Sequence, residues 1–397
     1  MSIQSRNRED ARSQPAHAAG LPLLVFADDW GRHPSSCQHL IRRLLDRHPV
    51  AWVNTIGTRK PRFDLDTLRR GLEKLRHWMR PSKDDAATLP AGLRVLNPRM
   101  WPSFDSRLAR WLNRRLLVPP LAAAARELGE PPIVVTTIPL VADLVGRLPV
   151  RRWVYYCVDD FSVWPGLDGA TLRCMEQELV RRADGIIAVS ENLQNRLADM
   201  GRPSHLLTHG VDLQFWQNSP EGAALERLQE HERPLVVFWG VVDRRMDTEF
   251  LANVTRKLQK GTVVLVGPEA DPDPTLQTLP RLVRTGPLVF EQLPALARQA
   301  AVLVMPYADL PVTRAMQPLK LKEYLATGKP VVVRDLPATR PWADCLDLVA
   351  SAASFAAAVE QRLAEGVPAA QQAARQRLTG EGWDEKAQTF ERLVCEP

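Results

Sequence analysis

Long apolar stretches are missing from this 397-residue sequence. None approaches the roughly 18 consecutive apolar residues that a membrane-spanning helix requires, so we expect no transmembrane segment. Residues 1–20 also lack the continuous apolar core of a signal peptide and show no apolar periodicity. We therefore expect a disordered leader over these residues.

Cysteine is scarce, and its spacing suggests no pairing. The cysteines are odd in number and form no CxxC motif: Cys37, Cys157, Cys174, Cys345 and Cys395. This pattern argues against a disulfide framework and against a zinc site. It favours the cytoplasm, a reducing compartment, as the location.

Several common catalytic motifs are absent as well. No GxGxxG follows the first apolar run, and Gly328-Lys329 is followed by Pro330 instead of the Ser or Thr of a phosphate-binding loop. HExxH and GxSxG do not occur. These absences argue against a dinucleotide-binding Rossmann site, a P-loop NTPase, a zinc metalloprotease and a serine hydrolase.

The composition is that of a globular protein with moderate positive charge. Hydrophobic residues make up 45% of the chain, and the formal net charge is +6. Length and composition suggest two or three domains with sizeable cores. The charge suits nucleotides, phosphates or anionic lipid surfaces without choosing among them. We expect no nucleic-acid partner.

Short apolar runs alternate with amphipathic helical patterns along the chain. The expected strands of the first half are Leu21–Ala27, Val50–Gly57, Leu93–Asn97, Ile133–Ile138, Arg152–Val158, Gly185–Ser190 and His205–Val211. Those of the second half are Leu235–Val242, Thr262–Gly267, Arg281–Thr285, Ala301–Pro306 and Val331–Arg334. Expected helices include Ser106–Leu117 and Leu172–Arg182. The alternation predicts an α/β fold with two doubly wound, parallel sheets.

The polar segment Gln214–Pro234 separates the two series and is interpreted as an interdomain linker. We expect a leader over 1–20, a first domain over 21–213, a second domain over 214–379 and a final helix over 380–397. Ligands of open parallel sheets bind beyond the carboxyl ends of the strands. Unusual polar or aromatic residues follow several of these strands: Asp28, Asp29, Trp30, Asp159, Asp160, His209, Arg244, Arg245 and Tyr307.

One stretch, PLKLKEYLATGKPVVV (Pro318–Val333), resembles the donor-binding helix and following strand of GT-B glycosyltransferases, especially family 4. Matches in the expected order are YYCVDDF (Tyr155–Phe161), AVSENL (Ala188–Leu193), THGVD (Thr208–Asp212), GVVDRRMD (Gly240–Asp247) and the terminal GWDEKAQTFERL (Gly382–Leu393). The resemblance covers nearly the whole chain from Leu21. It implies two Rossmann-like domains that face a central cleft, with a final helix crossing back onto the first.

The resemblance implies that Glu323 holds the ribose hydroxyls of a nucleotide-sugar donor. Lys320, three residues earlier, can share its helical face. Cations aimed at the diphosphate would stabilise the charge that grows as the glycosidic bond breaks, in place of a metal ion. The expected donor-binding residues are Gly240, Arg244, Arg245, Tyr307, Lys320 and Glu323. The alternatives are solvated loop arginines and an ordinary Lys–Glu helix pair.

Three further residues are candidates for catalysis. Asp159 and Asp160 follow an apolar strand, where one of them could deprotonate the acceptor hydroxyl as a general base. The alternative for Asp160 is a cap on the next segment. His209 could contact the donor's sugar or phosphate across the cleft, or bond to the backbone where the chain leaves the sheet.

The loop after the first strand would face the acceptor in a GT-B enzyme. Asp29, Trp30 and His33 could hold that acceptor, although Ser35 or Ser36 in the same loop could simply cap the helix that follows. Ala315 is a departure from the family pattern, because many family 4 enzymes carry a glutamate eight residues before the ribose-binding one. This leaves open whether transfer retains or inverts the anomeric configuration.

A basic amphipathic helix is expected within Arg59–Lys83. Between Phe63 and Arg80 an apolar stripe recurs at spacings of three and four: Leu65, Leu68, Leu72, Leu75 and Met79. The Arg59–Lys83 window holds nine basic and three acidic residues, a net +6. Such a helix, bearing Trp78, suits the inner face of an anionic membrane. The alternative is an ordinary helix that packs its leucines on the first sheet.

These observations predict a metal-independent glycosyltransferase of the hexosyltransferase type, which works without a cofactor. It would move a sugar from a nucleoside-diphosphate donor to a saccharide or lipid-linked acceptor in bacterial surface polysaccharide synthesis. Two alternatives stay open: a GT-B sugar-nucleotide epimerase, and a catalytically silent GT-B protein that binds a nucleotide sugar or a partner. Donor hydrolysis or transfer would exclude the silent protein.

Overall fold

The computed structural model describes residues 20–32, 34–54, 89–218 and 228–396. Within these ranges the first sheet has the order β3-β2-β1-β4-β5-β6-β7, and all its pairings are parallel. Its strands are β1 (Leu23–Ala27), β2 (Val50–Asn54), β3 (Leu93–Leu96), β4 (Ile133–Thr136), β5 (Arg152–Cys157), β6 (Gly185–Ala188) and β7 (His205–Leu206). The inner strand β1 is buried along its whole length, as its unbroken apolar sequence LLVFA predicts.

A second parallel sheet follows in the chain, with the order β12-β10-β8-β13-β14-β15. Its strands are β8 (Leu235–Trp239), β10 (Thr262–Val266), β12 (Leu282–Arg284), β13 (Ala300–Met305), β14 (Val331–Arg334) and β15 (Asp347–Val349). A short parallel pair, β9 (Val242–Asp243) and β11 (Glu269–Ala270), extends beyond β8 and β10. Two doubly wound units are therefore present, as the alternating pattern predicted.

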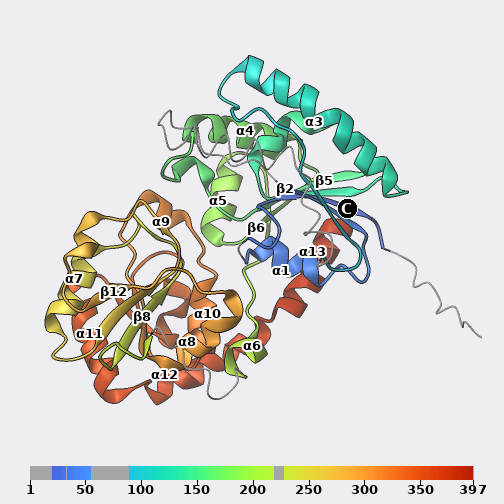
Figure 1. Cartoon of the computed structure of the whole chain (residues 1–397). Coiled ribbons are helices and arrows are strands. Elements are labelled where there is room, and N and C mark those ends of the chain that lie inside the picture. Colours follow the sequence, from blue (N-terminus) through green and yellow to red (C-terminus); the bar gives the residue numbers. More distant parts are fainter. Residues whose placement is uncertain (1–19, 33, 55–88, 219–227, 397) are drawn as a thin grey trace, which may run out of the picture.

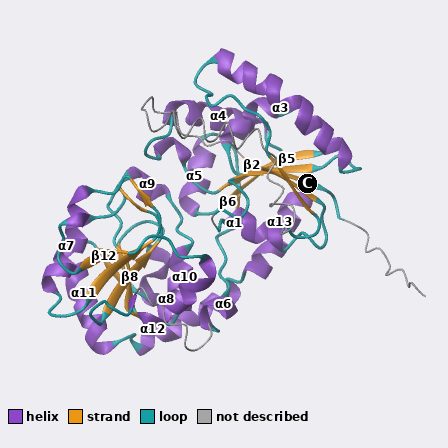
Figure 2. Cartoon of the chain, viewed as in Figure 1, coloured by secondary structure: helices purple, strands orange, loops and turns teal. Residues whose placement is uncertain are grey.

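Helices cover both faces of each sheet (Figure 2). Those of the first unit are α1 (Ser36–Arg42), α3 (Arg107–Glu127), α4 (Gly169–Arg182) and α5 (Glu191–Asp199). Those of the second are α6 (Leu213–Gln217), α7 (Thr248–Lys257), α8 (Leu293–Gln299), α9 (Pro311–Ala315), α10 (Lys320–Ala326), α11 (Ala352–Glu365) and α12 (Ala369–Ala374). Polar side chains cap many of them; Ser35 caps α1 by accepting from the Gln38 amide.

The last helix, α13 (Trp383–Cys395), leaves the second unit and packs on the first (Figure 1). Its buried face, which includes Trp383 and Phe390, belongs to the core of the first sheet. A parallel bridge between Val211 and Gly382 brings the outgoing and returning chain segments together between the two units. The expected return of the terminal helix is confirmed.

Some of the expected ends of strands and helices were wrong. The strand expected over His205–Val211 ends at Leu206, because the chain then leaves the sheet to pair with the returning segment. Helix α3 runs on to Glu127 through two prolines. The expected linker Gln214–Pro234 overlaps α6, whose Trp216 stacks on Trp239 in the second core, with ring centroids 5.4 Å apart.

The expected basic helix between Phe63 and Arg80 lies outside the described residues, as does His33. No described helix is long and apolar enough to cross a bilayer.

Candidate functional site

A pair of glycines shapes the end of the second sheet at the cleft. Gly240 follows β8 with φ of +140°, and Gly267 follows the adjacent β10 with φ of +149°. A Cβ on Gly240 would lie 1.9 Å from Lys320 Nζ, and one on Gly267 would lie 1.9 Å from the Gly240 carbonyl oxygen. Only residues without side chains allow this approach. The result is a backbone floor that lies directly against the Lys320 ammonium.

Lys320, at the start of α10, points its ammonium over aromatic rings. The Nζ atom donates to the Tyr307 hydroxyl at 2.8 Å and lies 4.6 Å from the centre of the Phe238 ring. No carboxylate of the described chain forms an ion pair with it. Cation–π contacts hold the ammonium in place but do not neutralise it. This cation at the strand ends is therefore available to an anion.

Glu323 lies one helical turn after Lys320 on the same helix. Its Oε2 accepts from Trp239 Nε1 at 3.4 Å, and the backbone N–H of Trp239 donates to the Tyr324 hydroxyl. Burial raises the pKa of Glu323 to about 7, against the opposing effects of the Trp239 hydrogen bond and the Lys320 charge. A half-buried carboxylate with one weak partner has acceptor capacity left for a ligand's hydroxyl groups.

Arg245 spans the cleft between the two domains. The Met246–Tyr307 bridge holds its loop against the end of β13, and its guanidinium pairs with Asp243 at 2.8 Å. The same guanidinium lies 4.8 Å from the ring centre of Trp164, which belongs to the first domain. The sequence pattern had not singled out Trp164, because no local periodicity reports a contact between residues so far apart in the chain.

Asp159 is the first-domain carboxylate that faces Arg245. Its Oδ1 is buried without a hydrogen-bond partner among the described residues. Burial raises the pKa of Asp159 to about 7, although the Arg245 charge opposes the shift. A carboxyl group that titrates near neutral pH can take up a proton from a reacting hydroxyl.

Asp160, its neighbour, has different contacts. Its Oδ1 accepts from the Ser162 amide at 3.0 Å and from the Ser162 hydroxyl at 2.6 Å, so it caps the turn Phe161–Val163. Its Oδ2 pairs with Arg196 Nε at 3.0 Å. The capping alternative for Asp160 is therefore what the structure contains, and both carboxylate oxygens have partners.

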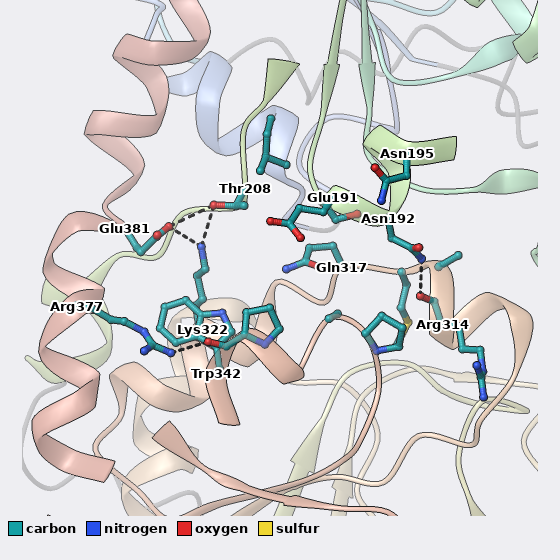
Figure 3. A pocket seen from close by; sticks show the side chains of 17 residues that line it. Glu191, Asn192, Asn195, Thr208, Arg314, Gln317, Lys322, Trp342, Arg377 and Glu381 are labelled. Carbon is teal, nitrogen blue, oxygen red and sulfur yellow. Dashed lines mark hydrogen bonds and ion pairs between the residues drawn. The ribbon is translucent and has the colours of Figure 1, made fainter. Parts of the chain in front are cut away.

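His209 lies where the chain passes from the first domain to the second. Its ring is buried, and burial together with the Lys322 charge lowers its pKa to about 3, against a hydrogen bond to the Gln317 backbone. The His209 carbonyl accepts from Lys322 Nζ, which also pairs with Glu381 at 2.6 Å (Figure 3). A neutral ring bonded to backbone matches the structural alternative given above for His209.

Arg244 lies apart from the cluster around Lys320. Its side chain is exposed and pairs with Asp271 at 3.4 Å and with Asp273 at 3.6 Å, on the loop after β11. The position of Arg244 matches the alternative of a solvated loop arginine, and a contact between Arg244 and the donor stays a prediction. Arg244 and Arg245 are adjacent in sequence but point to different surroundings.

The loop after β1 contains the expected acceptor-binding residues Asp29 and Trp30, but its side-chain hydrogen bonds centre on Asp28. Asp28 accepts from Ser35 Oγ at 3.0 Å and from Gln38 Nε2 at 2.9 Å, and burial raises its pKa. Asp29 is partly exposed and pairs with Arg32. Trp30 packs edge-on against Trp52 with centroids 4.8 Å apart, and its backbone N–H donates to Asn54.

Gly240, Tyr307, Lys320 and Glu323 therefore lie together in the second domain, with Arg245 beside Tyr307 and with Asp159 of the first domain close to Arg245. Within the described ranges no three His, Cys, Asp or Glu side chains gather as metal ligands do. Independence from metal stays a prediction.

Comparison with known proteins bears on this arrangement. Residues 233–365 match the family model described as "Glycosyl transferases group 1". The second domain is a group 1 glycosyl transferase domain. The chain is 29% identical over 176 residues to TuaH of Bacillus subtilis (strain 168), named as a teichuronic acid biosynthesis glycosyltransferase. That match spans 42% of this chain and 44% of the relative, less than half of either.

Several solved structures are similar in fold to this chain over nearly its full length. Sucrose-phosphate synthase from Thermosynechococcus elongatus has a TM-score of 0.69 at 18% identity and covers 94% of this chain and 98% of its own. HepE of Anabaena, in complex with UDP and glucose, has a TM-score of 0.66 at 14% identity and covers 95% and 100%. At these identities the likeness shows the fold, which is GT-B: the group 1 domain and the first domain face each other across a cleft.

Proposed function

We propose that this GT-B protein is a glycosyltransferase that moves a hexose from a nucleoside-diphosphate donor to a saccharide or lipid-linked acceptor. One observation carries the proposal: the Lys320 ammonium, which has no carboxylate partner in the described chain, lies one helical turn from Glu323 at the cleft edge of the group 1 domain. A cation beside a carboxylate with spare acceptor capacity suits a diphosphate joined to a ribose. The UDP and glucose bound by HepE of Anabaena make UDP-hexoses the first donors to test.

In this mechanism the bond between the anomeric carbon and the diphosphate oxygen breaks while a bond to the acceptor oxygen forms. Lys320 and the peptide groups at Gly240 would stabilise the negative charge that collects on the leaving diphosphate. Asp159, with a pKa of about 7, would take the proton of the acceptor hydroxyl. Arg245, already paired with Asp243, would keep Asp159 partly ionised at neutral pH.

A thermal-shift comparison of UDP-, GDP-, ADP- and dTDP-hexoses tests donor binding. A donor present at 100 times its dissociation constant should stabilise the fold by about 2.7 kcal/mol. We expect one nucleotide series to raise the melting temperature of the wild type and to lose that effect in Lys320→Ala. Absence of a shift with all four would contradict the proposal.

The products formed from a bound nucleotide sugar distinguish a transferase from an epimerase and from a silent binding protein. Release of free nucleoside diphosphate, through hydrolysis or through transfer to an added saccharide, would identify a transferase. Release of a sugar epimer would identify an epimerase, and donor binding with no product over long incubation would identify a silent binding protein. The configuration of the transferred sugar, followed by anomeric proton NMR, decides between retention and inversion.

Surface polysaccharide synthesis at the inner membrane face is our proposal for the biological setting. The support is the relation to TuaH of Bacillus subtilis and the excess of basic residues in Arg59–Lys83. A lipid-linked acceptor could then be met by a protein that binds anionic lipid through that segment.

A further inference from the structure

A hollow of about 410 Å³ lies between the domains and is separate from the Lys320–Glu323 cluster. The start of α5 lines one side, and the loop between α9 and α10 lines the other (Figure 3). Lys322 faces this hollow, whereas Lys320 faces Phe238 and Tyr307, so the two lysines project from different sides of α10. The proposed donor residues do not line the hollow.

The cations that line the hollow all have carboxylate partners. Lys322 pairs at 2.6 Å with Glu381, which it shares with Lys386 at 2.7 Å, and Arg377 pairs with Asp344 at 2.6 Å. Arg314 pairs with Asp309, its Nη2 lying 2.7 Å from Oδ2. Glu191 adds a negative charge at the N-terminus of α5, where an anionic ligand would otherwise be favoured. This charge distribution disfavours a phosphate and favours a neutral ligand.

Three polar side chains point into the hollow without a hydrogen bond to any described residue: Glu191, Asn195 and Gln317. They come from both domains, as Figure 3 shows, with Glu191 and Asn195 opposite Gln317. Asn192 Nδ2 donates to the Arg314 carbonyl oxygen at 3.0 Å and links the two sides. Two amides and a carboxylate supply both donors and acceptors to hydroxyl groups.

The remaining wall is apolar. Pro337, Pro341 and Trp342 line it; Trp342 is only 7% exposed, with the Arg377 guanidinium carbon 4.4 Å and the Lys322 ammonium 5.5 Å from its ring centre. The proline rings and the exposed part of the indole can pack against the C–H faces of a sugar ring, while the opposite polar groups reach its hydroxyls. A neutral saccharide is the ligand class that fits both sides.

The hollow adjoins the cleft centre through one side chain. Met316 lines the hollow, and its Sδ lies 3.8 Å from Arg245 Nη1, next to the proposed base Asp159. We propose that the hollow binds a neutral saccharide unit of the acceptor, adjacent to the unit that receives the sugar. The assignment to the acceptor rests on the proposed transferase function; the binding of a saccharide does not.

Saturation-transfer NMR on the full chain, without donor, tests saccharide binding directly. The probes are three neutral trisaccharides: cellotriose, maltotriose and laminaritriose. We expect transfer to at least one of them, and the Glu191→Ala/Gln317→Ala double variant to weaken its binding at least about tenfold, since each lost partner removes a hydrogen bond to a hydroxyl. UDP-glucose affinity, measured by calorimetry, should stay unchanged.

The matched control is Glu249→Ala/Gln277→Ala. Glu249 is an exposed carboxylate in the first turn of α7, as Glu191 is in α5, and Gln277 is exposed and does not line the hollow. The control should bind the trisaccharide as the wild type does.

Absence of transfer to all three probes, or equal affinity in wild type and double variant, would overturn the inference. Weaker UDP-glucose binding in the double variant would also overturn it, because the hollow would then belong to the donor. Trisaccharide binding by a protein that neither binds nor cleaves any donor would instead refute the proposed function and leave the saccharide site standing.

Discussion

Replacing Glu323 by glutamine removes a carboxyl group whose ionisation opposes folding. The folded chain raises the pKa of Glu323 from an ordinary 4.5 to about 7. Between these values the folded state keeps a proton that the unfolded state has lost, so the free energy of unfolding falls as the pH rises through this window. Below about pH 4.5 the penalty is absent, and above about pH 7 it is fully present.

The size of the penalty follows from the two pKa values. A tenfold change in an equilibrium is worth about 1.4 kcal/mol, so the shift corresponds to about 3 kcal/mol of folding free energy above pH 7. Glutamine keeps the shape and an oxygen that can accept from Trp239 Nε1, but it carries no charge. We therefore expect Glu323→Gln to stabilise the ligand-free protein by up to about 3 kcal/mol at pH 8.5 and by almost nothing at pH 4.5.

Thermal denaturation of wild type and variant at the two pH values is the assay. A gain of about 3 kcal/mol should raise the melting temperature at pH 8.5 by roughly 5–10 °C for a domain of this size. The control Glu249→Gln changes an exposed glutamate of α7 and should leave the melting temperature within about 1 °C, as surface substitutions usually do. Donor affinity at pH 8.5 should fall at least about tenfold in Glu323→Gln, because hydrogen bonds to a charged acceptor are stronger than those to an amide.

Two results would refute this reasoning. A variant with the same or a lower melting temperature at pH 8.5 would show that ionised Glu323 is not destabilising in the folded chain. A stabilised variant with unchanged affinity for every nucleotide sugar would show that the buried carboxylate exists for a reason other than ribose binding.

Four further predictions concern the cleft, the cap formed by Asp160 and the membrane. Gly240→Ala should displace the Lys320 ammonium, which a Cβ would approach to 1.9 Å, and lower donor affinity about tenfold or more by calorimetry. Asp159→Asn should lose about 10²–10⁴-fold in turnover while still binding donor. Asp160→Ala should lose about 1–3 kcal/mol of stability in urea unfolding, because it removes a cap and one of the two carboxylate partners of Arg196, the other being Glu176. Anionic liposomes should sediment the protein at low salt and release it at high salt, through the basic segment Arg59–Lys83.

The control for Gly240→Ala is Gly380→Ala. Gly380→Ala places a Cβ where no atom lies within 4 Å, and should leave donor binding unchanged; equal effects at both glycines would contradict the first prediction. Normal turnover in Asp159→Asn would remove that residue from the mechanism, and full stability in Asp160→Ala would contradict its structural role. Equal sedimentation with neutral and anionic vesicles, or none with either, would argue against an electrostatic membrane contact.

The sequence alone determined the parts of this protein that depend on local pattern. Continuous apolar runs such as Leu23–Ala27 and Thr262–Val266 can be buried on both faces only in a covered parallel sheet, so strand positions and the doubly wound class followed from them. Lys320 and Glu323 are three residues apart, so a helix over them brings the two side chains to neighbouring positions whatever the rest of the chain does.

Only the tertiary structure decided which of the expected residues lie together. Asp159 and Asp160 are adjacent in sequence, yet one faces Arg245 and the other is held by Ser162 and Arg196. Successive side chains after a strand point in different directions, and their partners come from segments far along the chain.

The sequence did not predict the contact of Trp164 or the hollow beside Gln317 for the same reason. Trp164 contacts Arg245 of the other domain, and Glu191 lines the hollow opposite Gln317 of the other domain. Hydrophobic periodicity reports only which face of an element is buried, whereas the distance between two domains is set by how the returning helix α13 and the segment around Val211 hold them together. No spacing within either domain encodes that distance.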